Sequence, residues 1–560
     1  MRGVNRRPLI MCMALSGIVG IPGTAELHRT GVPARPDDRT IVHVLNRIGF
    51  GPSPGDVERV RRMGLQAYID LQLTPERIGD ERLQPRLAAL TTLSKSTREL
   101  AAEYYIPAQM ERRERQRQQA AAQDPSMAAP APQSDAMRME RHALGEVMQA
   151  KVLRAAYSER QLEEVLVDFW FNHFNVFSGK GQVRMYLNEY ERDAIRPHVL
   201  GRFRDLLTAT AQSPAMLFYL DNWQSAAPEG AAPSAPDSRG PNARAGRRPL
   251  NRPDRPRPGA APAQVRTPAE LPPALPGRRR GLNENYAREI MELHTVGVDG
   301  GYTQQDVHNV ARAFTGWTIA NPRQGGGFYF DPRMHDDGEK IVLGRKLAAG
   351  GGRKDGEDVI ALLARHPSTA RFISTKLARR FVADEPPPAL VERAAATFRE
   401  SDGNIRDVVR TIVTSPEFFA AEHYRAKVKT PLEFVVSAVR AVNVDLPSAL
   451  PIVAALRNLG MPIYGCQPPT GYADRGDAWV NAGALLNRMN FAVSLTTERR
   501  FAAGVRAQRA AAAPAVTSDT VIASMLAGDL SQSTAATIGK AATEPQALAL
   551  VLGSPEFQRR

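Results

Sequence analysis

The segment 161–175, QLEEVLVDFWFNHFN, shows the pattern that decides the predicted fold. Leu162, Val165 and Phe169 recur at intervals of three and four, which is typical of one buried face of an α-helix. The same period runs upstream through 144–156, whereas alternating strand-like patterns are weak along the chain. The sequence therefore predicts a mainly α fold, a large multi-helix globular body with at most a short β-hairpin.

Helical periodicity returns repeatedly downstream of this segment. We expect helices near 186–209, 282–294, 304–316, 357–364, 368–382, 388–400, 404–414, 431–442, 449–458 and 478–496. Strand-like residues occur at 327–330 and 340–343, and we expect these two stretches to pair with each other as one hairpin. A chain of 560 residues is too long for one ordinary core, but its length suits several helical layers merged into one body.

Two low-complexity stretches interrupt the helical pattern. Residues 107–140 pass from a run of Arg, Gln and Glu into Ala, Pro, Gln and Ser, while residues 225–280 hold 13 prolines, 11 arginines and 4 acidic residues. In 107–140 we expect a charged helical tail followed by a flexible loop. Residues 225–280 have almost no aliphatic side chains to bury and so cannot offset the loss of chain entropy on folding. We therefore expect two disordered insertions, which separate helical parts at 38–106, 141–224, 281–500 and 501–560.

The first 25 residues have the features of an export signal peptide. Three arginines precede an almost uncharged apolar run at 9–21, and Gly-Thr-Ala at 23–25 supplies a small-x-small cleavage pattern. The apolar run is shorter than the roughly 20 residues that a membrane span needs, and no later stretch is long enough. A buried N-terminal helix is the alternative interpretation. We expect an exported protein, periplasmic or secreted, with no transmembrane segment beyond the signal peptide.

The composition limits the partners and the chemistry. Half of the formal charge of +14 falls within 225–280, where no aromatic residue is interleaved with the arginines. This placement favours an envelope protein or glycan as partner over nucleic acid. Two cysteines exclude a disulfide scaffold and multi-thiolate metal sites. Since the Gly-x-Ser-x-Gly elbow, the P-loop and a dinucleotide-binding glycine motif are absent, covalent serine hydrolases and nucleotide enzymes are disfavoured.

The aromatic segment around 170 carries the first candidate site. On a helix, Asp168 and Asn172 share one face, and His173 follows directly. An acid near an imidazole can set its tautomer for proton transfer or metal binding, so Asp168 and His173 are candidate catalytic residues. The alternative is a core helix whose polar groups satisfy one another.

A second candidate site lies on the predicted helix that follows the cap residue Asn283. Glu289 and Glu292 are further candidate catalytic residues, and a divalent cation is the cofactor that the sequence leaves open. Its candidate ligands are Glu284, Glu289, Glu292 and His294. The alternative is a salt-bridged helix, because Arg288 stands four residues from both Glu284 and Glu292.

Three shorter segments have weaker signals. Thr303 and Asp306 have the spacing of a capping box at the start of a helix. His335 precedes two aspartates, which indicates a polar turn or, less specifically, a hydrolase. Tyr472 and Trp479 lie near Asp and Asn residues, a pattern that suits sugar stacking as well as aromatic packing within a helical core.

Six blocks follow one another in a defined order along the chain. They are 46–51 (NRIGFG), 169–174 (FWFNHF), 283–289 (NENYARE), 294–303 (HTVGVDGGYT), 366–370 (HPSTA) and 415–418 (SPEF). In this order the chain resembles the bacterial family called Domain of Unknown Function 1800, over residues 38–500. The resemblance implies an exported helical protein and brings no assigned reaction. Tyr472 stands where many relatives have tryptophan.

Two classes of function follow, and whether the protein is an enzyme stays open. The first is binding of an envelope partner protein or glycan, which the lack of a complete catalytic motif favours. The alternative is a metal- or carboxylate-assisted hydrolase acting on an envelope or extracellular polymer. A shared site requires that 168–173 and 283–294 meet inside one folded body.

Overall fold

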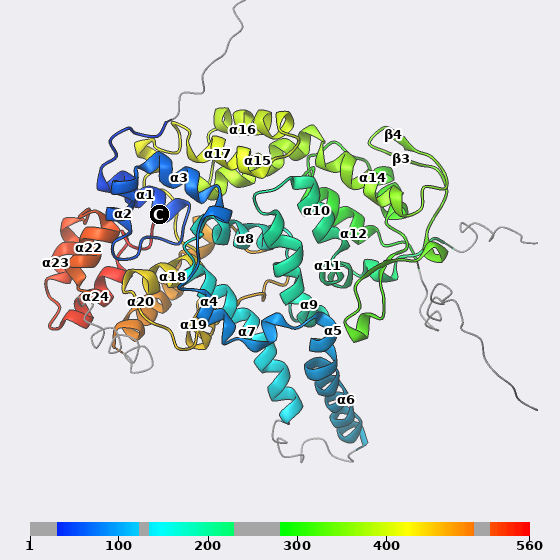
Figure 1. Cartoon of the computed structure of the whole chain (residues 1–560), viewed down its shortest axis with the longest axis horizontal. Helices are drawn as coiled ribbons and strands as arrows, with labels where there is room; N and C mark the ends of the chain where they lie inside the picture. The colour runs from blue at the N-terminus through cyan, green and yellow to red at the C-terminus, as the bar shows by residue number, and fades with distance from the viewer. Residues whose placement is uncertain (1–30, 122–133, 229–280, 498–515) are drawn as a thin grey trace, which may run out of the picture.

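The computed structural model describes residues 31–121, 134–228, 281–497 and 516–560, and these residues are mainly helical (Figure 1). The predicted signal peptide at 1–25 and most of the predicted insertion at 225–280 lie outside the described residues. No helix in the described ranges has the length and apolar character needed to cross a membrane.

The helices follow one another along the whole described chain. Those before residue 230 are α1 (Asp38–Arg47), α2 (Asp56–Met63), α3 (Leu65–Gln72), α4 (Gln84–Ala88), α5 (Thr97–Leu100), α6 (Ile106–Ala121), α7 (Asp135–Tyr157), α8 (Gln161–His173), α9 (Val183–Glu189), α10 (Phe203–Gln212) and α11 (Pro214–Tyr219). Those after residue 280 are α12 (Glu284–Glu289), α13 (Gln304–Ala313), α14 (Arg353–Ala364), α15 (Pro367–Phe381), α16 (Pro388–Glu400), α17 (Ile405–Val413), α18 (Pro431–Ala441), α19 (Leu450–Asn458), α20 (Ala482–Thr497), α22 (Ser518–Leu526), α23 (Gln532–Ile538) and α24 (Glu544–Gly553).

Short helical turns extend or connect these helices. Wider π-type turns are η3 (Ala101–Tyr105), η5 (Tyr190–Ile195) and η8 (Ile290–His294). Tighter 3₁₀ turns are η1 (Pro75–Arg77), η2 (Thr91–Ser94), η6 (Arg196–His198), η7 (Asn222–Gln224), η9 (Pro322–Gln324), η10 (Pro332–Met334), η11 (Ala421–His423) and η12 (Gly476–Trp479). The helix expected over 186–209 is interrupted at η6, because Pro197 lacks the N–H that a continuous helix needs.

The predicted strand pairing was wrong, although both strand positions were right. Phe328–Phe330 (β2) pairs antiparallel with Trp317–Ile319 (β1), and Lys340–Val342 (β3) pairs with Arg345–Leu347 (β4). The two residues between β3 and β4, Leu343 and Gly344, both have positive φ angles of 49° and 75°. Such a two-residue turn favours pairing with the next segment along the chain. The described residues therefore contain two small hairpins instead of one.

One continuous apolar core joins the N-terminal and C-terminal parts of the described chain. It runs from Ile41 in α1 to Phe557, and α8 crosses its middle with Trp170 fully buried. Figure 1 shows α22–α24 beside α1 and α2, while α14 and the β3–β4 hairpin lie at the opposite end of the molecule. The prediction of one large multi-helix body is confirmed by this arrangement.

Helices α6 and α7 project together from the body (Figure 1). Glu140 of α7 binds Arg112 of α6 and, at 3.2 Å, Arg184 of α9. The charged part of the predicted insertion at 107–140 is thus helical as far as Ala121 and again from Asp135. Residues 122–133 between them lie outside the described residues.

Candidate functional site

The two predicted site segments meet at a pair of histidines. His173 ends α8 and His294 ends η8, and their ring centroids lie 6.1 Å apart. The Nε2 atom of His173 lies 3.1 Å from the main-chain oxygen of His294. The expectation that 168–173 and 283–294 come together inside one body is therefore confirmed.

The contacts of His173 fix its tautomer. A carbonyl oxygen only accepts hydrogen bonds, so Nε2 of His173 carries the proton and donates it to His294. Nδ1 is then an acceptor, and Nζ of Lys376 in α15 donates to it at 2.8 Å. Burial first, and the charge of Lys376 second, hold the pKa of His173 well below its ordinary value. His173 is therefore neutral.

Lys376 is partly buried beside this neutral imidazole. Burial lowers the pKa of its ammonium to about 8, although the charge of Asp474 opposes the shift. Lys376 makes no ion pair with any carboxylate of the described residues. The same surroundings also act on His294, whose pKa is lowered to about 3 by burial and by Lys376.

Lys376 and His173 line a cleft of about 320 Å³ between α8, α15 and the loop 470–475, here called the α8–α15 cleft. Four basic and two acidic side chains face it. The basic residues are Lys376, Arg379, Arg380 and Arg475, and the acidic residues are Asp168 and Asp474. Its wall is therefore cationic overall, and it also carries the aromatic rings of Phe169 and Tyr472.

Asn172 holds the outer loop of the cleft in place. Its amide donates to the Tyr472 carbonyl at 2.8 Å, and its side-chain oxygen accepts the Tyr472 N–H at 2.7 Å. Gly471 makes this approach possible, because its φ is +73° and a Cβ there would lie 2.2 Å from the Asn172 carbonyl oxygen. The Tyr472 ring stands 6.0 Å from that of Trp479. The polar face of α8 therefore positions the loop.

Both acidic residues of the cleft already have basic partners. Asp168 lies 3.0 Å from Nζ of Lys151, and Asp474 lies 3.3 Å from Nζ of Lys427. Asp168 is therefore paired with lysine, and the carbonyl of His294 sets the tautomer of His173.

Two of the basic side chains are also paired, Arg380 with Glu433 and Arg475 with Glu385 at 2.7 Å. Lys376 and Arg379 are therefore the basic side chains of the cleft that form no ion pair with a carboxylate of the described residues.

The carboxylates of the second predicted site lie outside the α8–α15 cleft. Glu284 is partly exposed and contacts Gln304 at 2.8 Å and His308 at 3.2 Å, both in α13. Glu292 accepts from Arg288 at 3.2 Å, as the salt-bridged alternative predicted. Glu289 is half-buried, and burial followed by repulsion from Glu292 raises its pKa.

The predicted metal ligands are not gathered in one place. Within the described ranges, no set of three or more His, Cys, Asp or Glu side chains has an arrangement that could hold a metal ion. Of the four predicted ligands, His294 faces His173 while the three glutamates belong to the surface of α12 and η8. A divalent cation at this position stays a prediction.

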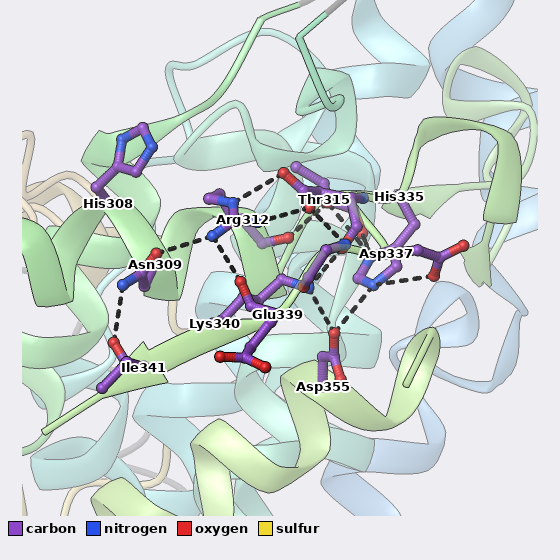
Figure 2. A network of polar contacts seen from close by, with 12 residues as sticks. His308, Asn309, Arg312, Thr315, His335, Asp337, Glu339, Lys340, Ile341 and Asp355 are labelled. Atoms are coloured by element: carbon purple, nitrogen blue, oxygen red, sulfur yellow. Dashed lines mark hydrogen bonds and ion pairs between the residues drawn. The ribbon is translucent and has the colours of Figure 1, made fainter. Parts of the chain in front are cut away.

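A second histidine–lysine network closes the loop before β3 (Figure 2). His335 is fully buried, donates from Nδ1 to the Thr315 carbonyl at 2.8 Å, and has Nε2 3.3 Å from Asp355. Lys340 donates to the same Asp355 carboxylate at 2.7 Å. Burial opposes the charge of Asp355, but hydrogen bonds from His335 and Lys340 lower its pKa. The sequence interpretation of this segment as a polar turn is confirmed.

A cavity of about 260 Å³ also lies beside α2 and α18. Asp56 in its wall binds Arg59 at 2.9 Å and Arg440 at 3.2 Å, while Arg62 and Arg82 line it without an ion pair in the described residues. Arg440 additionally donates to the main-chain oxygens of Gly51 and Ala156. This cavity lacks a histidine–lysine contact like that of the α8–α15 cleft, and the α8–α15 cleft is therefore the candidate site.

Sequence reasoning missed the basic residues of α15. Lys376 and Arg380 are four residues apart and lie among Ile373, Leu377 and Phe381, which are fully buried. A lysine and an arginine within an apolar stripe are uncommon in a helix, because buried charges need partners. That pattern was available in the sequence and is the signal that could have found them.

Two local predictions at the edge of the site are confirmed. Asn283 caps α12 by accepting from the N–H of Tyr286 at 3.2 Å. Thr303 and Asp306 form a reciprocal capping box at the start of α13. These caps place the start of each helix and so fix how α12 and α13 pack together.

Comparison with known proteins identifies the family. The model of the family described as protein of unknown function (DUF1800) matches residues 43–559, nearly the whole chain. The chain belongs to the DUF1800 family. No curated protein and no solved structure matches it. The resemblance seen in the ordered sequence blocks is therefore confirmed, and the α8–α15 cleft belongs to the region that the DUF1800 model covers.

Proposed function

We propose that this DUF1800 protein is exported and binds an acidic glycan of the cell envelope in the α8–α15 cleft. The observation that carries the proposal is the lining of the cleft, where both carboxylates are paired with lysines while Lys376 and Arg379 form no ion pair within the described residues. An anionic sugar polymer would supply negative charge opposite these basic side chains. The basic start and apolar run of residues 1–25 support export.

The shape and polarity of the cleft favour a sugar over an apolar ligand. Tyr472 offers an aromatic face at the rim, and Trp479 stands next to it. Arg475 pairs with Glu385 at 2.7 Å, whereas Arg379 donates to the main-chain oxygen of Asp384 and forms no ion pair within the described residues. Arg379 therefore places positive charge in the wall of the cleft. Aromatic rings beside basic groups suit stacking on a sugar ring with simultaneous pairing of its acidic substituent.

Binding to paired oligosaccharides tests the proposal. The full chain without its predicted signal peptide is titrated with oligogalacturonate and with a neutral oligosaccharide of equal length. We expect tighter binding of the acidic oligosaccharide, with an affinity that falls as salt rises, because exposed charges are screened. Equal affinity for the two oligosaccharides, or no binding of either, contradicts the proposal.

Two arginines of the same helix provide a matched comparison for this test. Arg379→Gln removes a charge that lines the cleft, and we expect a loss of about fivefold to tenfold in affinity. Arg371→Gln removes a charge from α15 outside the cleft, at a residue whose side chain is 70% exposed. That variant should bind like the parent. Equal losses in both variants would indicate attraction to the surface as a whole.

The second candidate function is hydrolysis of such a polymer in the same cleft. It is favoured by the contact between Lys376 and the neutral His173, since groups with displaced pKa values in a cleft are candidates for proton transfer. Of the predicted catalytic carboxylates, Asp168 lines this cleft, whereas Glu289 and Glu292 lie outside it. Release of reducing ends that is lost in Lys376→Met supports hydrolysis, and a parent protein that releases none contradicts it. Elemental analysis of the purified protein tests the predicted divalent cation.

A further inference from the structure

Lys376, which is partly buried, differs in the chemistry of its partner from three buried lysines of the described chain. Lys151, Lys340 and Lys427 each face at least one carboxylate. The side-chain hydrogen-bond partner of Lys376 is Nδ1 of His173, an uncharged acceptor. A lysine without a carboxylate partner loses its proton more readily, and the neutral amine has a lone pair that can attack carbon.

The position of Lys376 in the fold supports this chemistry. Lys376 lines the α8–α15 cleft, a space of about 320 Å³ that can hold a ligand. In the neutral amine, one N–H points to His173, while the lone pair and the second hydrogen are not engaged by His173. His173 is itself held by the His294 carbonyl. The histidine therefore acts as a positioning residue for the amine.

We propose that Lys376 is a nucleophilic amine that forms a reversible imine with an aldehyde or ketone carried by an acidic ligand in the α8–α15 cleft. The inference rests on the proposed function in one respect, namely that the ligand is acidic. The open-chain aldehyde at the reducing end of an acidic oligosaccharide has both required groups. Arg379 would pair with its carboxylate while its carbonyl carbon approaches Lys376.

The proposed step balances without an oxidant or a reductant. The Nζ lone pair attacks the carbonyl carbon, a C–N bond forms, and the carbonyl π electrons move to oxygen. Proton transfer from nitrogen to oxygen gives a carbinolamine. Loss of one water molecule, which contains the former carbonyl oxygen, then gives the imine, and water reverses the step.

Reductive trapping tests the proposal. The full chain without its predicted signal peptide is incubated with glyoxylate and cyanoborohydride, which reduces an imine to a stable secondary amine, and labelled lysines are mapped by peptide mass spectrometry. We expect Lys376 to be labelled roughly tenfold or more faster than exposed lysines near pH 8, since more of it is neutral there. A folded protein in which Lys376 stays unlabelled overturns the proposal.

The chain contains its own control for the role of the cleft. Lys429 is also buried, donates to Ser437 at 2.8 Å, and has a pKa lowered to about 7 by burial. It does not line the α8–α15 cleft. If access through the cleft decides reactivity, Lys429 stays unlabelled, and the exposed Lys346 reacts slowly. Labelling of Lys429 as fast as Lys376 contradicts the proposed role of the cleft.

Variants separate chemistry from folding. Lys376→Arg keeps a positive charge but has no nucleophilic amine, so it should abolish this label while the melting temperature stays close to that of the parent. His173→Leu removes the acceptor and should slow labelling severalfold, whereas His173→Gln keeps an acceptor and should restore it. Equal labelling in the Leu and Gln variants overturns the positioning role of His173.

A second aldehyde distinguishes this inference from the proposed function. Formaldehyde has no acidic group, so it reports on the amine alone, whereas glyoxylate reports on the amine and the basic wall together. Labelling of Lys376 by both aldehydes, with glyoxylate favoured and the preference lost in Arg379→Gln, supports both proposals. Labelling without any glyoxylate preference supports the nucleophilic amine and counts against an acidic ligand. Tight binding of oligogalacturonate without labelling by either aldehyde overturns the imine alone.

Discussion

The α8–α15 cleft and the network behind β3 both contain a buried histidine beside a lysine, partly buried in the cleft and buried in the network, but the charges are balanced differently. In the network, Lys340 and His335 converge on the carboxylate of Asp355 (Figure 2). In the cleft, Lys376 meets His173, and neither is paired with a carboxylate. The same residue types therefore form a closed structural network in one region and leave a reactive amine in the other.

The difference shows what a buried carboxylate does for a lysine. A buried ammonium is costly unless an anion and further acceptors replace its lost hydration. Lys340, which is 1% exposed, has Asp355 and two main-chain carbonyls as acceptors. Lys376 has a neutral acceptor, so burial acts on it with little compensation and its pKa falls to about 8. The α8–α15 cleft, where the charge of a lysine is not compensated by a carboxylate partner, is therefore a better candidate for ligand binding than the Asp355 network.

The largest expected effect comes from removing the anion of the closed network. Asp355→Asn leaves Lys340 buried without its counter-charge, and we expect a loss of about 3 kcal/mol in the free energy of unfolding. Asp358→Asn on the same helix is the matched control, because its partner Lys354 is 68% exposed. Urea denaturation at pH 7 measures both. Similar stabilities of the two variants would mean that the network needs no anion.

The pH dependence of stability tests the cleft side of the comparison. The pKa of Lys376 is lowered from 10.5 to about 8, so the unfolded chain binds more protons than the folded one between these values. Stability should therefore rise with pH across this window, by about 3 kcal/mol in total, and Lys376→Met should remove that rise.

Urea denaturation of the parent and of Lys376→Met is measured from pH 7 to 10. The difference between their free energies of unfolding isolates the contribution of Lys376 from that of other titrating groups. At pH 7 the Met variant should be at least as stable as the parent, because it removes an uncompensated buried amine. A Met variant that loses stability at pH 7 and keeps the parent's pH slope would place an unrecognised anion beside Lys376.

The smallest expected effect lies at the exposed rim of the closed network. Glu339 pairs with Lys346 at 2.7 Å, and both side chains are about half exposed or more. Glu339→Gln should change the free energy of unfolding by less than about 0.5 kcal/mol, since exposed ion pairs contribute little. Arg312 binds the main-chain oxygen of Glu339, which the substitution leaves intact. A change as large as that of Asp355→Asn would mean that the rim and the buried part of the network act as one unit.

The helices were predictable because their signals are local. Apolar spacing placed α13, α15, α16 and α18 to within a few residues, and capping residues such as Asn283 marked where helices begin. The strand pairing was missed because hairpin partners depend on turn geometry. The two positive-φ residues after β3 selected β4 as its partner, although strand propensity favoured β2.

In the candidate site, too, local patterns were predictable and contacts between distant segments were not. Sequence reasoning found His173, Asp168 and Asn172, because an aromatic helix with polar residues on one face is visible in fifteen residues. It missed Lys376, which meets His173 across a separation of 203 residues, and the loop that Asn172 holds from 300 residues away. It also grouped Glu284, Glu289, Glu292 and His294 by helical spacing, whereas the glutamates and His294 contact different neighbours in the structure.

The sequence by itself determined the helical class, the positions of most helices and the family, because each depends on patterns within a few residues or on their order. The tertiary structure alone decided which charges are compensated. Asp168 meets Lys151 and Lys340 meets Asp355, while Lys376 meets a neutral imidazole. These pairings follow from how distant helices pack, and the electrostatic free energy of a buried group depends on the neighbours that packing brings to it.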